Sequence, residues 1–330
     1  MLKGVDACDD ATARVVTVNS DGSFVGRSMP LERRQVVSND VTAASVDCAA
    51  APGTCDVEVT GSLGAPSGSP ARAPLTFDPK APFVVASAHA APATALRDMQ
   101  FVTVTGTGFT PGAAVNLQEC ALPLTPLADC DGTNVDSVSA GYLGHFTSTF
   151  AVRRMLPGGF TTSGELETID CAAKARRCGL SVQGTASQAP ASVPLTFDPK
   201  DAAVTPAISA SPNTGLHDNQ QIAVTLRGFT PGQTVQVSEC SAAAILQTPF
   251  GCDMTTSRTT TPAGPQPVSM SFRVHAGSGG QAGLTNCTKR PGACVLVAEE
   301  IGTSVLAGGI TVTTSGGSSS PSVKLTFAAP

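Results

Sequence analysis

Short runs of alternating apolar and polar residues recur along the chain, and each run ends at a turn that contains Gly or Pro. Residues 101–106 (FVTVTG) and 115–120 (VNLQEC) have the period of two that is typical of half-buried strands. Between them, residues 109–112 (FTPG) predict a turn, because Pro presets its own φ and Gly accepts a positive φ. The same criteria predict strands at residues 83–87, 135–140, 146–153, 169–172, 179–184 and 193–198, with loops at 120–130 and 156–164.

This pattern predicts an all-β chain without amphipathic helices, and the number of short strands fits an immunoglobulin-like, seven-stranded Greek-key sandwich. The fold is predicted to repeat in tandem, because residues 74–80 (PLTFDPK) recur identically at 194–200 and, in a decayed form, at 324–327. Residues 108–112 (GFTPG) recur at 228–232 with the same shift of 120 residues. We therefore predict three modules: module 1 (residues 1–80), module 2 (residues 81–200) and module 3 (residues 201–330).

The eleven cysteines follow the same repeat. Modules 2 and 3 each have a wide pair, whose members are ten or twelve residues apart, and a narrow pair, whose members are seven residues apart. No C-x-x-C spacing occurs and the four histidines do not recur in register, so disulfides are favoured over metal sites. We predict the disulfides Cys48–Cys55, Cys120–Cys130, Cys171–Cys178, Cys240–Cys252 and Cys287–Cys294.

Cys8 has no partner in this scheme. It precedes Cys48 by 40 residues, much as Cys130 precedes Cys171 by 41 residues. We therefore expect Cys8 to be unpaired here, as the second member of a wide pair whose first member lies upstream of Met1 together with a signal peptide. Module 1 is then the C-terminal half of a sandwich, with an uncovered sheet edge and low stability in isolation. Because disulfides persist in oxidising compartments, we expect a secreted, extracellular or cell-envelope protein.

Composition narrows the range of functions. The net charge is −5, charged residues make up 14% of the chain, and Trp is absent. An acidic surface does not neutralise phosphates, so no direct nucleic-acid binding is expected. No apolar run approaches the roughly 20 residues that a membrane span requires. The Arg pairs at 33–34, 153–154 and 176–177 are expected to be solvated.

Candidate catalytic chemistry is sparse. Neither G-x-S-x-G nor H-E-x-x-H occurs, and we expect no enzyme and no catalytic residue. Residues 129–134 (DCDGTN) resemble the start of a calcium loop, but the distal Glu is missing and Cys130 belongs to a pair. A turn is therefore favoured there, and no metal site is predicted. Phe109 and Phe229 are expected to pack beneath their turns as part of the core.

Several motifs together resemble one family. They are residues 211–218 (SPNTGLHD), the repeated GFTPG, residues 118–121 (QECA) with a second Cys ten positions after the first, residues 150–154 (FAVRR), and residues 168–171 (TIDC) followed by 178–181 (CGLS). In this combination they resemble the neocarzinostatin/macromomycin/actinoxanthin family, the apoproteins of secreted actinomycete enediyne chromoproteins. In module 1, residues 33–34 and 46–48 are expected to keep the same register.

The resemblance implies a seven-stranded sandwich with two disulfides and a cleft that has the wide disulfide at its base. In the family this cleft holds an enediyne chromophore non-covalently, and the chromophore, rather than the protein, cleaves DNA. An antibiotic-binding, antimicrobial role and a small apolar or aromatic ligand are thus implied. The cleft positions that match are Cys120, Leu122, Leu127, Cys130, Val135 and Phe160 in module 2, and Cys240, Ile245, Leu246 and Cys252 in module 3.

Two functions remain open at this point. The chain has Leu122 and Val135 where the family's prototype has Trp and Phe, which removes aromatic stacking for a conjugated ligand. Tandem copies also suit an alternative, in which the modules are immunoglobulin-like spacers or adhesion modules without a ligand. The retained wide pair and its apolar loop favour ligand binding. The sequence does not define an oligomeric state.

Overall fold

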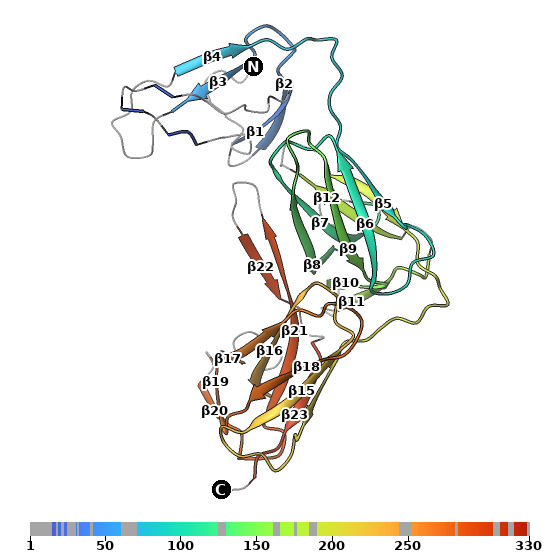
Figure 1. The fold of residues 1–330 in the computed structure, drawn as a ribbon, viewed down its shortest axis with the longest axis vertical. Coiled ribbons are helices and arrows are strands. Elements are labelled where there is room, and N and C mark those ends of the chain that lie inside the picture. The colour runs from blue at the N-terminus through green and yellow to red at the C-terminus, as the bar shows by residue number, and fades with distance from the viewer. Residues whose placement is uncertain are drawn as a thin grey trace.

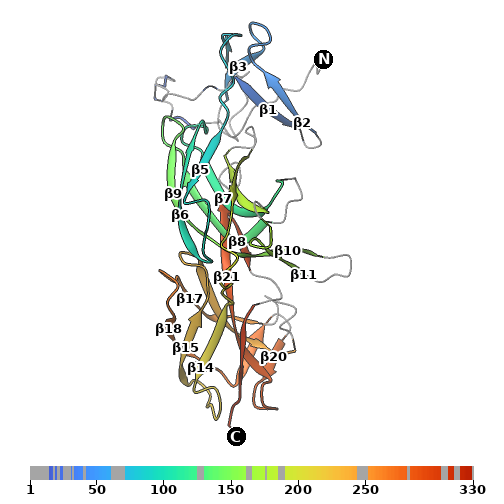
Figure 2. The same ribbon diagram turned by 90° about the vertical axis from the view of Figure 1, so that its right-hand side faces the viewer.

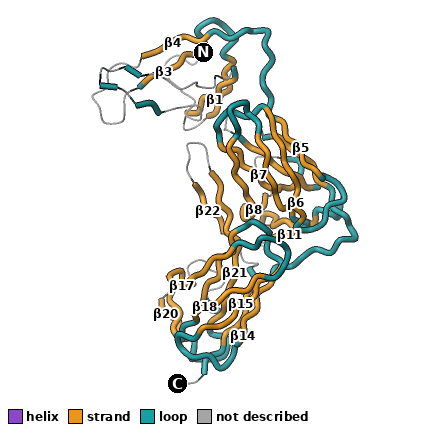
Figure 3. The backbone as a smooth tube through the Cα atoms, viewed as in Figure 1, coloured by secondary structure: helices purple, strands orange, loops and turns teal. Residues whose placement is uncertain are grey.

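A computed structural model describes residues 15–17, 19–20, 23–24, 31, 33–39, 42–60, 71–124, 130–160, 166–174, 177–184, 190–243, 252–280, 283–305, 311–315 and 320–328. These residues form strands, turns and loops, and none of them lies in a helix (Figure 3). Two sandwiches follow one another along the long axis of the molecule, with the strands of module 1 at the N-terminal end (Figure 1). The predicted fold class, an all-β tandem repeat of immunoglobulin-like sandwiches, is confirmed.

The described part of module 1 contains two small antiparallel sheets. In the first, β1 (Arg34–Asn39) pairs with β2 (Thr42–Asp47). In the second, β3 (Cys55–Val59) pairs with β4 (Ala71–Leu75). The disulfide Cys48–Cys55 joins the end of the first sheet to the beginning of the second.

Module 2 is a sandwich of a three-stranded and a four-stranded sheet. The order of the first sheet is β5-β6-β9 and that of the second is β13-β12-β7-β8, while β10 and β11 form a separate ribbon. Figure 2 shows this ribbon projecting from the end of the sandwich that is nearer module 3. The bounds are β5 (Ser87–Ala91), β6 (Gln100–Thr107), β7 (Ala114–Ala121), β8 (Cys130–Ser139), β9 (Phe146–Val152), β10 (Met155–Phe160), β11 (Leu166–Asp170), β12 (Cys178–Gln183) and β13 (Ala191–Leu195).

Module 3 repeats this arrangement with one extension. Its three-stranded sheet has the order β14-β15-β18, and its larger sheet has the order β17-β16-β21-β22, with β23 also paired to β21. The ribbon is formed by β19 and β20. The bounds are β14 (Ala207–Ser211), β15 (Gln221–Arg227), β16 (Thr234–Ser241), β17 (Cys252–Thr260), β18 (Val268–Arg273), β19 (Gly277–Gly280), β20 (Gly283–Asn286), β21 (Cys294–Val305), β22 (Thr311–Ser315) and β23 (Ser322–Leu325).

Strand alternation builds each core. In β6, Val102 and Val104 are buried while their neighbours are exposed, as the period of two requires. Leu117 of β7 and Phe150 of β9 reach the same apolar cluster from opposite sheets. Phe109 and Phe229 are buried as predicted, and the rings of Phe109 and Phe146 meet edge to face with their centroids 5.3 Å apart.

Three local predictions are wrong. Residues 83–86 are not part of a strand, because pairing with β6 begins only at Ser87. Residues 156–160 are not a loop but belong to β10, where pairing with β11 overrides the low strand propensity of Pro and Gly. Residues 131–134 are not a turn but an irregular stretch of β8, because the register with β7 shifts between Gln118 and Cys120.

The Arg pairs differ from the prediction in two ways. In module 1 Arg34 lies opposite Asp47, and in module 2 Met155 lies opposite Asp170. Arg33 therefore corresponds to Arg154, so the predicted alignment of the Arg pairs of the two modules is wrong by one residue. Arg153 is not solvated, since only 7% of its side chain is exposed. Its partners include Asp98 of module 2, the linker and Thr230 of module 3. A sequence pair of arginines carries no signal of partners so distant.

A core substitution with a matched surface control tests this assignment of faces. Leu117→Ala removes a fully buried side chain and should lower the free energy of unfolding by about 2–5 kcal/mol. Leu143→Ala truncates a side chain that is 64% exposed and should change it by less than about 0.5 kcal/mol. Urea denaturation of the full chain measures both, and equal effects would show that the faces of β7 are assigned wrongly.

Candidate ligand-binding face

The wide disulfide of module 2 joins the end of β7 to the beginning of β8. Cys120 and Cys130 are directly opposite one another in this antiparallel pair and form the disulfide. Because Val115 and Leu117 point into the core, Gln118 and Cys120 belong to the other face of the sheet. We call this the outer face, meaning the face of the four-stranded sheet that is turned away from the three-stranded sheet.

Small and polar side chains surround the disulfide on the outer face. Gly179 of β12 lies opposite Cys120, and Ser181 lies opposite Gln118. Val135 of β8 lies on the other side of Gln118 and is buried. A Cβ placed on Gly179 would lie 2.6 Å from the carbonyl oxygen of Val193 and 2.9 Å from Cδ1 of Leu122. Glycine is therefore required here, because it lets Leu122 and the neighbouring strand approach closely.

Leu122 is placed by a backbone contact. Its N–H donates to the carbonyl oxygen of Arg177 at 2.7 Å, which holds the first residue after β7 beside the beginning of β12. Its side chain is half-buried over Gly179. The structure thus brings together four of the six cleft residues predicted for module 2, namely Cys120, Leu122, Cys130 and Val135.

The other predicted cleft residues lie wholly or partly outside the described part of the chain. Leu127, Ile245 and Leu246 lie outside the described residues. Phe160 ends β10 opposite Leu166, but its side chain is outside the described part as well. These positions remain predictions.

Module 3 fills the equivalent space with its own side chains. Cys240 and Cys252 form the disulfide, Val295 lies opposite Cys240, and Val297 lies opposite Ser238. The two cysteines and the two valines form a separate buried apolar cluster. In module 2 the positions of these valines are occupied by Gly179 and Ser181, and Leu122 packs over Gly179, so this part of the sheet carries smaller and more polar side chains.

A ribbon lies close to each of these faces. In module 2, β10 approaches both β7 and β8, and in module 3, β19 approaches both β16 and β17. Figure 2 shows the β10–β11 ribbon extending away from the β7–β8 side of module 2. The ribbon and the β7–β8 edge of the sheet are thus neighbours in space in module 2.

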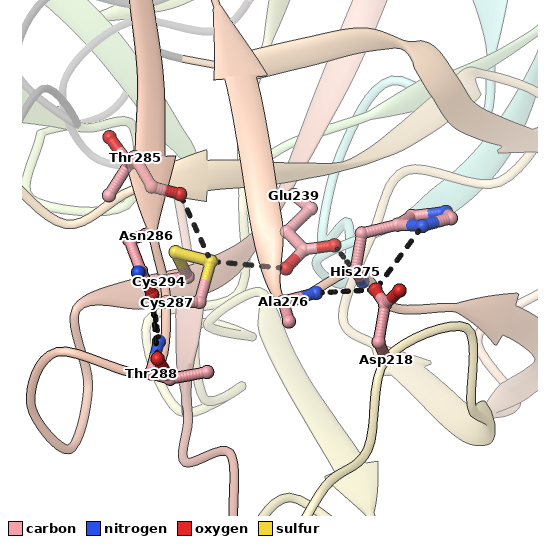
Figure 4. Close-up of a disulfide and its surroundings, with 9 residues drawn as sticks. All are labelled: Asp218, Glu239, His275, Ala276, Thr285, Asn286, Cys287, Thr288 and Cys294. Atoms are coloured by element: carbon pink, nitrogen blue, oxygen red, sulfur yellow. Dashed lines mark hydrogen bonds and ion pairs between the residues drawn. A yellow bond between two sulfur atoms is a disulfide. The ribbon is translucent and has the colours of Figure 1, made fainter. Parts of the chain in front are cut away.

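A buried glutamate precedes the first cysteine of each wide pair. Glu119 is fully buried, and its Oε2 accepts the N–H of Arg153 at 2.7 Å. In module 3, Oε2 of Glu239 accepts the N–H of His275 at 2.9 Å (Figure 4). Each carboxyl group thereby satisfies a backbone donor just after the chain leaves the three-stranded sheet. The repeat of Glu-Cys is visible in the sequence, and the period of two places the glutamate on the same face as Val115 and Leu117.

Burial raises the pKa of both glutamates, because desolvation disfavours the charged form. The pKa of Glu239 rises to about 8. Glu239 also lies against the disulfide Cys287–Cys294 (Figure 4). Because both sulfurs are in a disulfide, this group offers no thiolate to a metal ion.

A shallow hollow of about 290 Å³ lies elsewhere, on the three-stranded sheet of module 3. It is lined by Gln221, Ile222, Ala223, Ser269, Met270 and Ser271. The hollow is open and lies on β15 and β18, away from both wide disulfides, so it is not the predicted cleft. In the part of the chain that the structure describes, no helix is long and apolar enough to cross a membrane.

Comparisons with known proteins agree with this geometry. The sequence model of the neocarzinostatin family matches residues 88–197 and 208–314, which is more than half of the chain. Macromomycin from Streptomyces macromomyceticus is 32% identical over 78 residues, or 24% of this chain, and the match spans 53% of macromomycin.

Solved structures show partial likeness. The macromomycin structure is 27% identical with a TM-score of 0.30, over 34% of this chain and 100% of that one. The structure of apokedarcidin is 24% identical with a TM-score of 0.28, over 34% of this chain and 98% of that one. A tetra-tandem repeat from the extending region of a large adhesion protein is 15% identical with a TM-score of 0.24, over 93% of this chain and 65% of that one.

Sandwiches with a cross-strand disulfide on the outer face and a ribbon beside it define a disulfide-stabilised binding fold of the chromoprotein type. The chain belongs to the neocarzinostatin family, in tandem copies.

The buried glutamates predict how stability depends on pH. The pKa of Glu239 is about 8 in the folded chain and has its ordinary, lower value in the unfolded chain. The unfolded chain therefore loses its proton first as the pH rises. The stabilising difference is fully present below the unfolded pKa and is lost as the pH rises to about 8.

We expect the thermal midpoint to fall as the pH rises from about 5 to about 8. The double variant Glu119→Gln/Glu239→Gln keeps a neutral side chain at both sites, so its midpoint should change much less over the same range. Calorimetry of both proteins across the range checks this. An unchanged pH dependence in the variant would show that these glutamates are not the groups that titrate.

Proposed function

We propose that the chain is a non-enzymatic binding protein whose outer face of module 2 takes a small apolar or aromatic ligand. One observation supports this most directly. The surface beside Cys120–Cys130 carries Gly179 and Ser181, where module 3 has two buried valines. At these two positions module 2 has smaller and more polar side chains than module 3, and Leu122 packs over Gly179. An apolar surface with a few polar groups suits a small ligand.

The chemistry of the face sets the class of ligand. Leu122, Val135 and the disulfide provide apolar contact, while Gln118 and Ser181 provide a few hydrogen-bonding groups. Without Trp, affinity must come from shape and desolvation rather than from stacking between aromatic rings. An enediyne-like chromophore, as the family resemblance implies, is one member of this class, and it would be held non-covalently.

We propose further that the protein works outside the cytoplasm. Five disulfides are present among the described residues, and each occupies a pair of cysteines that the repeat predicts. A chain with this many cross-links requires an oxidising compartment. Mass spectrometry after alkylation of free thiols in protein from its natural source tests this. Alkylation of the ten paired cysteines would contradict it.

The alternative, a spacer or adhesion array without a ligand, is favoured by a different observation. Buried polar contacts join modules 2 and 3, as described in the next subsection, and a stiff connection is what a spacer needs. The two functions differ in whether a small molecule binds saturably to module 2.

A titration with a fluorescent aromatic polyketide tests the proposed function. Daunorubicin serves as the probe, and the absence of Trp keeps the protein's own emission low. We expect saturable quenching by the full chain. Ser181→Val copies the valine of module 3 and should weaken binding at least about tenfold, because the added methyl groups occupy the face.

Thr103→Val provides the matched control, since it adds an apolar side chain at an exposed position on the other sheet of module 2. It should leave binding unchanged. Absence of saturable quenching in the unmodified chain would contradict the proposal, and equal loss in both variants would show that the outer face is not the site.

A further inference from the structure

A guanidinium is buried between modules 2 and 3. Arg153 follows β9, and its Nη1 donates to Oγ1 of Thr230 at 2.7 Å and lies 3.5 Å from Oε1 of Glu300. Its Nη2 donates to the carbonyl oxygen of Val204 at 3.4 Å, and its Nε lies 3.6 Å from Oδ1 of Asp98. One side chain of module 2 thus contacts the linker, the turn between β15 and β16, and β21 of module 3.

Asp98 anchors the linker from the other side. Its Oδ2 accepts the N–H of Val204 at 2.6 Å, and its own N–H donates to Oδ2 of Asp201 at 2.8 Å. Its Oδ1 accepts the N–H of Arg154 at 2.9 Å. The side chain of Asp98 is fully buried, so these bonds are shielded from water. The linker between the modules is therefore held in place rather than left as a free tether.

Polar side chains of β8 extend the contact. Nε2 of Gln233 donates to Oδ1 of Asn134 at 3.1 Å, and Oγ1 of Thr133, which donates to Asp131, lies 3.5 Å from Oε2 of Glu300. Burial confirms that module 3 covers this end of β8. Asp131 and its counterpart Asp253 make the same bonds to the threonine two residues later, yet Asp131 is 3% exposed while Asp253 is only half-buried.

A long hairpin continues from this contact. β21 runs on past Glu300 to Val305 and pairs there with β22, whereas its counterpart β12 ends at Gln183. Both strands of the hairpin lie close to β8 (Figures 1 and 2). β8 is the edge strand of the four-stranded sheet, and it carries Cys130 and Val135 of the candidate site.

The sequence differs between the two junctions at the positions of Arg153 and Glu300. Arg33 corresponds to Arg154 by strand register, and in the sequence the residue before Arg33 is Glu32 where the residue before Arg154 is Arg153. Glu300 lies opposite Val235, and the matching position in module 2 is Gly184, the residue after Gln183. The arginine and its acidic partner are thus particular to the junction of modules 2 and 3.

We infer that modules 2 and 3 form one rigid binding unit, in which the β21–β22 hairpin is a side wall of the ligand face of module 2 and Arg153 is the positioning residue that sets it. The role of the hairpin as a wall rests on the proposed function, whereas the rigidity of the unit does not. The proposed site then has three parts. Its base is the outer face of the four-stranded sheet, and its sides are the β10–β11 ribbon of module 2 and the β21–β22 hairpin of module 3. Removing Arg153 leaves the carboxylates of Asp98 and Glu300 buried without their cation, so the junction should open.

The test combines hydrogen exchange with ligand titration on the full chain. In Arg153→Ala, amide exchange in residues 130–139 and 298–305 should rise at least about tenfold, while β5, β6 and β9 stay protected. Daunorubicin affinity should fall at least about tenfold. Arg153→Lys keeps a positive charge and should recover part of both effects. Arg273→Ala, an exposed arginine at the far end of module 3, is the matched control and should change neither.

The outcomes separate the two proposals. Unchanged exchange in Arg153→Ala would overturn the rigid unit. Increased exchange with unchanged affinity would overturn the role of the hairpin as a wall. Absence of daunorubicin binding by the unmodified chain would overturn the proposed function, while the exchange result would still decide rigidity. If Arg153→Ala does not fold, Glu300→Gln, which removes the charge and keeps the shape, is measured in the same way with the same expected directions.

Discussion

Near the end of β7, two neighbouring side chains, Glu119 and Cys120, point to opposite faces of the strand. Glu239 and Cys240 do the same near the end of β16 in module 3. Glu119 turns into the core and holds the N–H of Arg153, while Cys120 turns outward and holds β8 through its disulfide. Much of the functional surface follows from this alternation. The inward residue places the start of the junction with module 3, and the outward residue forms the base of the candidate ligand face. The two sites therefore share a single dipeptide.

Repetition made much of the fold predictable. Motifs recur after 120 residues, and the cysteines keep the same register. This repeat indicated the strands that lie at the two ends of each wide and each narrow cysteine pair. Alternation in β6 and β7 identified core positions because each side chain of a strand is either inside or outside. By contrast, β10 was predicted as a loop, since its strand character comes from pairing with β11 and not from its Pro and Gly residues.

The candidate site was predictable only in part. The disulfides and Leu122 were visible in the sequence, but the significance of Gly179 and Ser181 appears only when their register with Cys120 and Gln118 is known. Arg153 was expected in solvent because its partners Thr230 and Glu300 are 77 and 147 residues away. Burial of a charged group is decided by such distant partners, and a local pattern does not contain them.

Modules 2 and 3 use one fold in two ways. Module 3 fills the space beside its wide disulfide with Val295 and Val297 and extends a hairpin towards its neighbour. Module 2 has Gly179 and Ser181 at the corresponding positions, with Leu122 packed over Gly179, and its strand β8 lies beside that hairpin. On this account the tandem arrangement is itself part of the binding site, because one module supplies the face and the other supplies a wall. A spacer function and a binding function need not compete if stiffness is what positions the wall.

The most direct test of this account is an amide chemical-shift map of the full chain during titration with daunorubicin. The account predicts saturable shifts on β7, β8 and β12 around Gln118, Val135 and Ser181, together with shifts on β21 beyond Glu300. Shifts confined to the hollow around Ile222 and Met270, or spread without saturation over both modules, would contradict it.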